Sequence, residues 1–233
     1  MKGFIITGTS SGIGKSLCDL LLEDNNNRVL GISRTQKIEH QNYIHLSIDL
    51  TDQSKIESIK LPDWENADQL TLIHNAGWVG PIKKIGNQNS KNILDAYMIN
   101  IIAPTLLSNL FISTYSNISC EKVILSISSG AAKYAIQGWN TYCSSKAALD
   151  MLSNCIREEH ENIISLSIAP GKVNTAMQKE IRLADEKEFP RLKEFQKYYQ
   201  DGSLIPSKIV ANKYKKIISS ASKYLHINHI SEV

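Results

Sequence analysis

Short apolar segments alternate with amphipathic segments along the whole chain. The apolar runs fall at residues 3–7, 28–33, 43–48, 70–74, 122–128, 163–168 and, more weakly, 224–228. Apolar positions recur at helical spacing over residues 15–23, 54–60, 92–115, 141–160 and 207–219. This alternation predicts an α/β fold, a doubly wound parallel sheet with helices on both faces. We expect one domain over residues 1–233, because no repeat or linker divides the chain.

Two segments depart from a simple strand–helix alternation. Only nine residues, Arg34–Asn42, separate the second and third expected strands, which is too few for a full helix and its turns. The segment 172–206 is long and carries two helical patterns, near 177–184 and 189–199. An insertion at the carboxyl edge of a parallel sheet borders the ligand crevice. We therefore expect the segment 172–206 to cover a bound ligand.

Composition narrows the class of protein without naming a function. With 42% hydrophobic and 21% charged residues, the 233-residue chain is an ordinary globular domain. A net charge of +3 gives no nucleic-acid footprint, and no apolar run approaches the ~20 residues of a membrane span. The four cysteines lack metal or redox spacing, so we expect no metal site. These features favour a cytoplasmic enzyme that binds neither nucleic acid nor membrane.

A glycine-rich turn follows the first apolar run. Gly8, Gly12 and Gly14 form the pattern Gly-x-x-x-Gly-x-Gly between an expected strand and an expected helix. Glycines in this position let the backbone approach a pyrophosphate, and the helix start offers free amides. The sequence therefore predicts a dinucleotide site, although a turn that only joins strand to helix remains the structural alternative.

A proton-transfer pair is spaced for one face of a helix. Tyr142 and Lys146 are four residues apart, and Ser129 precedes the tyrosine by thirteen residues. An ammonium beside a phenol stabilises the phenolate, so we expect Lys146 to lower the pKa of Tyr142. A tyrosine tuned in this way can exchange a proton with an alcohol or carbonyl oxygen. Taken alone the pair is a weak signal, because many helices carry one by chance.

Together these motifs resemble the short-chain dehydrogenase/reductase family over nearly the whole chain. The resemblance also includes Asp49-Leu50, Asn75-Ala76-Gly77, with His74 where the family has asparagine, and Pro170-Gly171 followed by Thr175. It implies a seven-stranded Rossmann sheet and a substrate lid at 172–206. The implied catalytic residues are Asn100, Ser129, Tyr142 and Lys146. The implied cofactor-binding residues are Gly8, Ser10, Ser11, Gly12, Ile13, Gly14, Arg34, Asp49, Leu50, Asn75, Ala76, Gly77, Tyr142, Lys146, Pro170, Gly171, Val173 and Thr175.

The end of the second strand indicates which nicotinamide cofactor is used. A carboxylate there would favour NAD, whereas this chain has Arg34, twenty positions beyond Gly14. A guanidinium can hold a 2′-phosphate with a pair of hydrogen bonds, so we expect NADP(H). A solvated loop arginine is the alternative. Asp49 is expected to contact adenine, to cap the helix that begins near residue 51, or both.

Within the family, the resemblance narrows toward sepiapterin reductases and (S)-benzoin-forming benzil reductases. Gly138–Cys143, Asn174–Gln178 and Asp201–Leu204 carry it. It implies an NADPH-dependent reductase of ketones or 1,2-dicarbonyls, with Tyr142 as proton donor. The alternatives are a pterin reductase, a 3-oxoacyl thioester reductase and a non-catalytic NADP-binding regulator. We expect a homodimer or homotetramer, with a substrate site formed by Ser129, Trp139, Tyr142 and Met177, unless the larger side chains belong to the core.

Overall fold

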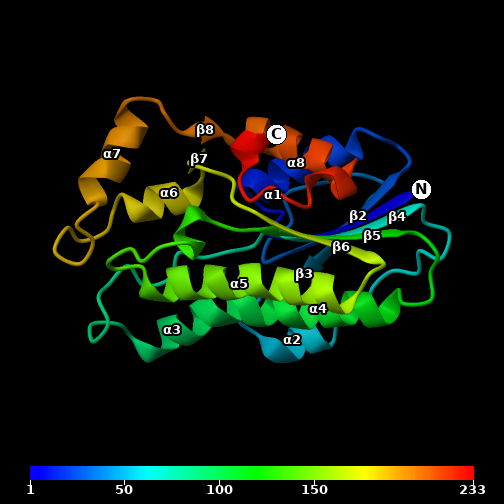
Figure 1. Ribbon diagram of the computed structural model, residues 1–233, viewed down its shortest axis with the longest axis horizontal. Coiled ribbons are helices and arrows are strands. Elements are labelled where there is room, and N and C mark those ends of the chain that lie inside the picture. The colour runs from blue at the N-terminus through cyan, green and yellow to red at the C-terminus, as the bar shows by residue number, and fades with distance from the viewer.

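Six parallel strands form the central sheet of the computed structural model, which describes residues 1–233 (Figure 1). They are β1 (Lys2–Thr7), β2 (Asn27–Ser33), β3 (Tyr43–Ser47), β4 (Gln69–His74), β5 (Glu121–Ile127) and β6 (Ile163–Ile168). Their spatial order is β3-β2-β1-β4-β5-β6, so the direction of winding reverses between β1 and β4. Ligands of doubly wound sheets bind at this reversal, beyond the carboxyl ends of the strands.

The seventh strand, expected at residues 224–228, is not formed. This end of the chain approaches β6 only through one parallel bridge between Ala169 and His229. The Ala169 amide donates to the Asn228 carbonyl at 2.8 Å, and the Ile230 amide donates to the Ala169 carbonyl at 2.9 Å. The 3₁₀ helices η3 (Ala221–Tyr224) and η4 (Ile230–Glu232) enclose the bridge. Pro170 follows Ala169 and has no amide to extend the ladder, so the pairing stops there.

Helices cover both faces of the sheet (Figure 1). Helices α1 (Gly12–Leu22) and α8 (Ser207–Ile218) pack together on one face. The other face carries α2 (Gln53–Glu57), α3 (Ser90–Tyr97), α4 (Ala103–Thr114) and α5 (Asn140–Glu159). A π-helical turn, η1 (Met98–Ile102), makes α3 and α4 continuous. As the short connection predicted, no helix forms between β2 and β3.

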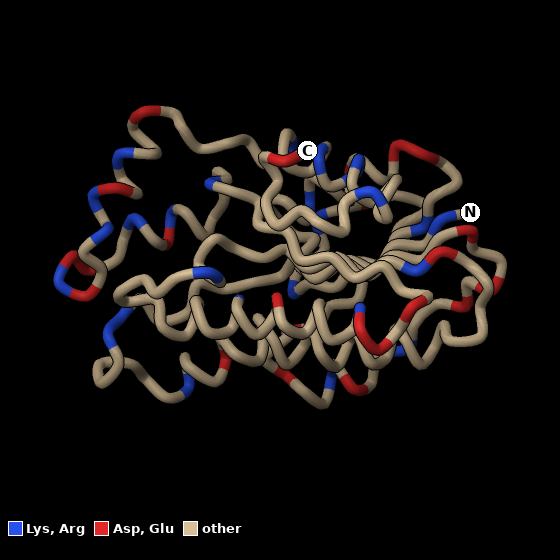
Figure 2. Tube along the Cα trace, in the orientation of Figure 1, with Lys and Arg blue, Asp and Glu red and all other residues tan.

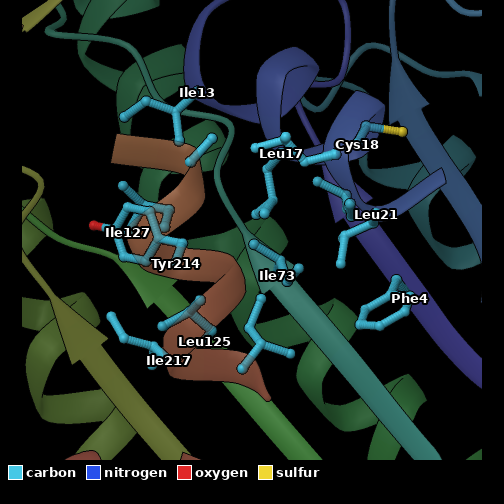
Figure 3. Packing of buried hydrophobic residues seen from close by; sticks show 14 of the residues in the cluster. Phe4, Ile13, Leu17, Cys18, Leu21, Ile73, Leu125, Ile127, Tyr214 and Ile217 are labelled. Carbon is cyan, nitrogen blue, oxygen red and sulfur yellow. The ribbon is translucent and has the colours of Figure 1, made fainter. Parts of the chain in front are cut away.

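The largest apolar core lies between the sheet and the pair α1 and α8 (Figure 3). Leu17 from α1 and Ile217 from α8 are fully buried against Ile73 of β4. The Tyr214 hydroxyl reaches through this core and donates to the Ile168 carbonyl at 2.8 Å. That bond holds the carboxyl end of β6, where the substrate end of the crevice is expected.

The continuous helix Ser90–Thr114 is long and apolar enough to cross a membrane. In this fold it packs against α2 and α5, and Leu107 and Phe111 lie in the second apolar core. Core helices of soluble proteins pass the same test of length and composition, so the helix is weak evidence for a membrane span.

The segment 172–206 forms a separate arm beside the sheet (Figure 1). Its ends are joined by the two-stranded pair β7 (Val173–Asn174) and β8 (Ile205–Pro206), and between them lie α6 (Ala176–Ile181) and α7 (Leu192–Gln200). Charges of both signs are frequent along the arm (Figure 2). Ile181 and Phe189 are nevertheless buried, at 2% and 0% exposure. The polar stretch 179–188 is thus attached by apolar side chains near both ends.

An aromatic cluster attaches the arm to the body of the protein. The Trp139 ring, at the start of α5, stacks on Phe189 with ring centroids 5.2 Å apart. It also contacts Phe195 of α7 and the edge of Tyr142. The arm therefore rests directly beside the expected catalytic tyrosine, in the position of a lid.

Candidate active site

The glycine turn is built so that only glycine fits at three positions. Gly8 and Gly12 have φ of +75° and +57°, a region that other residues rarely adopt. At Gly14 a Cβ atom would lie 2.3 Å from the Gly8 carbonyl oxygen and from Asn75 Nδ2. Ser11 precedes α1 without forming a side-chain cap, so the first-turn amides of α1 have no side-chain partner.

Two polar side chains hold this turn against the end of β4. The amides of Asn75 and Ala76 both donate to Thr7 Oγ1 at 3.0 Å. Asn75 Nδ2 donates in turn to the carbonyls of Thr7 and Gly8, at 2.9 and 3.2 Å. The predicted motifs at residues 8–14 and 75–77 are therefore one structural unit. Thr7, the residue directly before Gly8, is its centre.

The far end of the crevice carries the residues expected at the adenosine. Arg34 is exposed at the end of β2, and its carbonyl accepts from Ser47 Oγ at 3.0 Å. Asp49 Oδ1 accepts from the Thr51 amide and hydroxyl, both at 3.0 Å. These bonds, and secondarily Arg34, lower the pKa of Asp49. The expected capping role of Asp49 is wrong, because Asp52 caps α2 by accepting from the Lys55 amide. Leu50 is buried beside this turn.

Asn100 lies at the π-helical turn and is fully buried. Its Oδ1 accepts from the Trp78 amide at 2.9 Å, and its Nδ2 donates to the Trp78 carbonyl at 2.8 Å and to Ser145 Oγ at 3.1 Å. A Cβ atom on Gly77 would lie 3.5 Å from both Asn100 Oδ1 and Lys146 Nζ. The loop after β4 therefore passes directly over the Asn100 and Lys146 side chains. π turns of this kind are frequent at functional sites.

Ser129 and Tyr142 meet at the carboxyl end of β5. Ser129 caps the short 3₁₀ helix η2 (Gly130–Ala132), where its Oγ accepts from the Ala131 amide at 3.2 Å. The nearby Ser129 side chain acts to lower the tyrosine pKa. The Tyr142 hydroxyl also faces Met177 Sδ of the lid at 3.8 Å. Ser129, Tyr142 and Met177 are thus brought together as the sequence predicted.

Lys146 is buried one turn after Tyr142 on α5. Its Nζ donates to the Ile127 carbonyl at 2.8 Å and lies 5.9 Å from the centre of the Tyr142 ring. Burial lowers the pKa of Lys146 to about 8, while the Asp150 carboxylate acts in the opposite direction. The lysine is thus close enough to its charge transition to act at neutral pH.

The expected effect of Lys146 on Tyr142 is not found in the polypeptide itself. Burial raises the pKa of Tyr142 to about 12, outweighing the effect of Ser129. The Lys146 ammonium donates to the Ile127 carbonyl rather than to the phenol, so it does not offset the effect of burial on Tyr142. The structure therefore holds Tyr142 as a protonated phenol.

The segment after β6 meets the glycine turn from the opposite side. Thr175 precedes α6, and a Cβ atom on Gly12 would lie 3.3 Å from Thr175 Cγ2. Gly171 turns the chain with φ of +76°, directly after Pro170, and Val173 is buried in β7. Trp139, expected either at the substrate or in the core, is 5% exposed and packs within the lid cluster.

Three further residues make polar contacts around the site, and of these Asp150 did not stand out in the sequence. Asp150 on α5 accepts from Ser128 and Ser167 and pairs with Lys133. Trp78 Nε1 donates to Glu180 Oε1 of the lid at 2.7 Å. His74 Nε2 is 2.8 Å from Ser108 Oγ, and burial lowers the pKa of His74 to about 3, with a smaller effect of Lys146. A polar residue on an amphipathic helix ordinarily faces solvent, so the sequence carried no signal for Asp150.

These residues fit a nicotinamide dinucleotide. The turn around Gly12 exposes backbone without a side chain, and the uncapped α1 amides suit a pyrophosphate. Arg34, Asp49 and residues 75–77 follow the carboxyl ends of β2, β3 and β4, and a Cβ atom on Gly77 would lie 3.5 Å from Lys146 Nζ. A doubly wound sheet with such a turn and with Ser129 beside buried Tyr142 and Lys146 defines a dinucleotide-dependent oxidoreductase as the class of protein.

Comparison with known proteins agrees with this class. Residues 2–186 match the model of the short chain dehydrogenase family. The chain is 33% identical to a benzil reductase ((S)-benzoin forming) of Bacillus subtilis (strain 168), covering 100% of this chain and 99% of that enzyme. It is 28% identical to a sepiapterin reductase of Rattus norvegicus, covering 92% and 90% of the two chains. The crystal structure of the KRED1-Pglu enzyme superposes with a TM-score of 0.83 at 24% identity, over 94% of this chain and 95% of that one.

The protein therefore belongs to the short-chain dehydrogenase/reductase family, whose members bind nicotinamide cofactors and act on CH–OH or C=O groups. The benzil reductase similarity further supports a carbonyl reductase within this family.

Proposed function

We propose that the protein is an NADPH-dependent reductase of ketones and 1,2-dicarbonyl compounds, with Tyr142 as proton donor. The observation that carries this proposal is the grouping of half-buried Ser129 with the buried side chains of Tyr142 and Lys146. When bound, the nicotinamide supplies the hydride that reaches the carbonyl carbon. The side chains of this chain supply the proton, hold the carbonyl oxygen and keep water out.

Tyr142 would protonate the carbonyl oxygen, and the Ser129 hydroxyl would hold that oxygen by a hydrogen bond. A general acid must carry its proton at the working pH. The buried phenol, with a pKa of about 12, is fully protonated at neutral pH.

Lys146 would hold the ribose beside the nicotinamide and replenish the proton of Tyr142. Its pKa of about 8 makes proton release at neutral pH accessible. Asn100 would order a water that links Lys146 to solvent. The carboxyl end of β6 would receive the carboxamide through Val173 and Thr175.

Arg34 would select NADPH over NADH. Its guanidinium is exposed at the end of β2, where no carboxylate of that strand competes for the ribose hydroxyls. Asp49 would accept from the adenine amine with the Oδ2 atom that the Thr51 hydrogen bonds leave free. Ser10, Ser11, Ile13 and Leu50 would contact the cofactor through their backbone.

The substrate is proposed to be an aryl ketone or diketone that packs against Met177 and the edge of the Trp139 cluster. The sulfur of Met177 is 3.8 Å from the Tyr142 hydroxyl, so an apolar group next to the reacting carbonyl would contact the thioether. The similarity to a benzil reductase over the whole chain supports this choice. Reduction of sepiapterin is the second candidate, supported by the similarity to a sepiapterin reductase.

A homo-oligomer is proposed as the working state. Three apolar side chains on the helical face away from the lid are exposed, namely Leu94, Ile102 and Met151, at 65%, 40% and 60%. A second copy that covers α3 to α5 would bury them. Light scattering of the purified protein tests this, and a monomer at micromolar concentration would reject it.

The direct test of function is a panel of ketones, diketones and pterins with NADPH or NADH, followed by cofactor oxidation. We expect turnover of aryl diketones with NADPH. If the cofactor binds, as shown by quenching of protein fluorescence, but no carbonyl is reduced, the protein is a nucleotide-binding regulator rather than a reductase.

A further inference from the structure

A carboxylate outside the predicted catalytic set links the ends of two strands to the catalytic helix. Asp150 lies one turn after Lys146 on α5, and its side chain is only 14% exposed. Ser128 Oγ and Ser167 Oγ both donate to the same oxygen, Oδ1, at 2.5 and 2.6 Å. Its second oxygen, Oδ2, accepts from Lys133 Nζ at 2.9 Å. Both oxygens are therefore engaged.

Each partner of Asp150 is adjacent to a functional segment. Ser128 immediately precedes Ser129, and Lys133 follows the 3₁₀ helix that Ser129 begins. Ser167 lies near the end of β6, three residues before Pro170. The Ser128 amide also donates to the Ile168 carbonyl at 3.1 Å, which brings the two strand ends together. Asp150 and Tyr142 lie on the same helix, α5, and Ser128, which donates to Asp150, directly precedes Ser129. A change at Asp150 would therefore move Ser129 relative to Tyr142.

We propose that Asp150 is a positioning residue for the reaction: its Oδ1 fixes Ser129 relative to Tyr142, and its negative charge, one helical turn from Lys146 on α5, favours the protonated form of that lysine. This inference rests on the proposed function. It assigns no contact between Asp150 and substrate or cofactor.

The charged groups around Lys146 support the electrostatic half of the inference. Asp150 on the same helix is the one carboxylate that raises the pKa of Lys146, against burial. The other titratable neighbours are Tyr142 on α5, a protonated phenol, and His74 at the end of β4, which burial keeps neutral. Lys133 is the cation that offsets Asp150 from the loop side. Removal of the Asp150 charge would leave Lys146 without a favourable partner charge.

The two oxygens allow geometry and charge to be separated. In Asp150→Asn, the amide oxygen can still accept from both serines, whereas the charge is lost. In the double variant Ser128→Ala/Ser167→Ala, the charge remains and both serine bonds are lost. Asp19→Asn is the matched control, because it removes an exposed i,i+4 ion pair with Lys15 on α1.

The measurements are the pH profile of kcat with benzil, the NADPH dissociation constant, the melting temperature, and NMR titration of Lys146 Nζ without cofactor. For Asp150→Asn we expect the Lys146 midpoint and the alkaline limb of kcat to move to lower pH, by at least about half a unit. For the double serine variant we expect kcat to fall by about tenfold or more, with the Lys146 midpoint and the NADPH affinity unchanged. The control should match the wild type in all four measurements.

The inference is overturned if Asp150→Asn keeps the wild-type Lys146 midpoint, or if the double serine variant loses only melting temperature. Asp150→Glu provides a second route if Asp150→Asn does not fold: it keeps the charge, so its alkaline limb should stay at the wild-type position while kcat falls. The NMR titration does not depend on turnover. A shifted Lys146 midpoint in an enzyme that reduces no carbonyl would therefore reject the proposed function and retain the electrostatic role of Asp150.

Discussion

The two ends of the crevice differ in how tightly their side chains are held. At the nicotinamide end, Asn100, Tyr142 and Lys146 are 0%, 6% and 3% exposed, and each has partners within the protein. At the adenosine end, Arg34 is exposed and its side chain forms no hydrogen bond, and Asp49 is held by its own turn. The nicotinamide end is therefore held by buried side chains with hydrogen-bond partners, whereas cofactor binding at the adenosine end relies on individual side chains.

This difference separates two kinds of specificity. A buried network such as Asn100–Trp78–Ser145 fixes the geometry of proton transfer, and any change there leaves polar groups without partners. Arg34 can be exchanged at little cost to the fold, because its side chain is exposed and forms no hydrogen bond. We therefore expect the rate of proton transfer to depend steeply on the buried residues of the nicotinamide end. The choice between NADPH and NADH should depend on the adenosine end.

The largest effect is expected at Tyr142. Tyr142→Phe removes the proton donor and keeps the ring that packs on Trp139. We expect kcat to fall by about 10²–10⁴-fold, with NADPH affinity retained. Tyr224→Phe is the control and should keep full activity, because Tyr224 packs against the apolar core between the sheet and helices α1 and α8. Near-wild-type turnover of Tyr142→Phe with every carbonyl tested would reject Tyr142 as the donor.

Lys146 should impose a pH dependence on stability. Its folded pKa of about 8 lies below its ordinary 10.5, so the unfolded chain binds more protons between these values. The free energy of unfolding should therefore gain a contribution that rises with pH across this window, on the order of 3 kcal/mol. Lys146→Met should lack it.

The comparison of the two unfolding curves is needed because other groups act oppositely. Burial raises the pKa of Cys18 to about 12, which lowers stability above pH 9, and Tyr142 does the same above pH 10. Both contributions are common to the wild type and Lys146→Met, and cancel in the difference between their denaturant midpoints. A difference that is constant from pH 7 to pH 10 would show that the Lys146 pKa is not depressed.

A substitution of Arg34 tests the role of the adenosine end in cofactor selection. Arg34→Ala should weaken NADPH binding by about ten- to a hundredfold and leave NADH binding nearly unchanged, because only NADPH carries the 2′-phosphate. Arg28→Ala, at the opposite end of the same strand, is the matched control. Dissociation constants from fluorescence titration decide the outcome, and equal losses for the two cofactors would mean that Arg34 is not the selector.

The contrast between the two ends also explains what the sequence could predict. Periodicity and motif order located the strands, most helices and the glycine turn, because these depend on local pattern. The prediction of a seventh strand was wrong, because the 3₁₀ turns that begin at Ala221 and Ile230 leave no recognisable hydrophobic pattern in the sequence. The prediction that Lys146 lowers the pKa of Tyr142 was wrong for a different reason. The spacing of the two residues does not reveal that Lys146 donates to the Ile127 carbonyl. Asp150 was missed because its partners come from other elements.

The lid tests a third level of constraint, between the two ends. Gly138 has φ of +83°, and a Cβ atom there would lie 2.7 Å from the Glu188 carbonyl oxygen. Gly202 has φ of +64° with nothing within 4 Å of such an atom. Both Gly→Ala variants carry the strain of positive φ, but only Gly138→Ala also displaces the lid backbone. We expect it to lose about 1–3 kcal/mol more stability than Gly202→Ala, and to raise KM for the carbonyl substrate.

Chemical denaturation and steady-state kinetics measure these two effects. Equal losses for the Gly138 and Gly202 variants would show that the lid backbone at Glu188 moves easily away from the body of the protein. A larger loss for Gly138→Ala would instead show that the lid is held closed by its contacts with the body of the protein.

The smallest expected difference concerns the substrate. A pterin would need a carboxylate for its guanidine-like edge, and Asn228 near the chain end is neutral. The nearby Glu232 is engaged, because its Oε1 accepts from the amides of Asn228 and His229 at 3.1 and 2.8 Å. A flat diketone needs no such anchor and can pack on Met177. We therefore expect a higher kcat/KM for benzil than for sepiapterin, both measured with NADPH.

A preference for sepiapterin of about tenfold or more, equal to about 1.4 kcal/mol, would reverse this ordering. Glu232→Gln would then identify the anchor: it keeps an oxygen for the two amides and removes the charge, so only pterin reduction should fall.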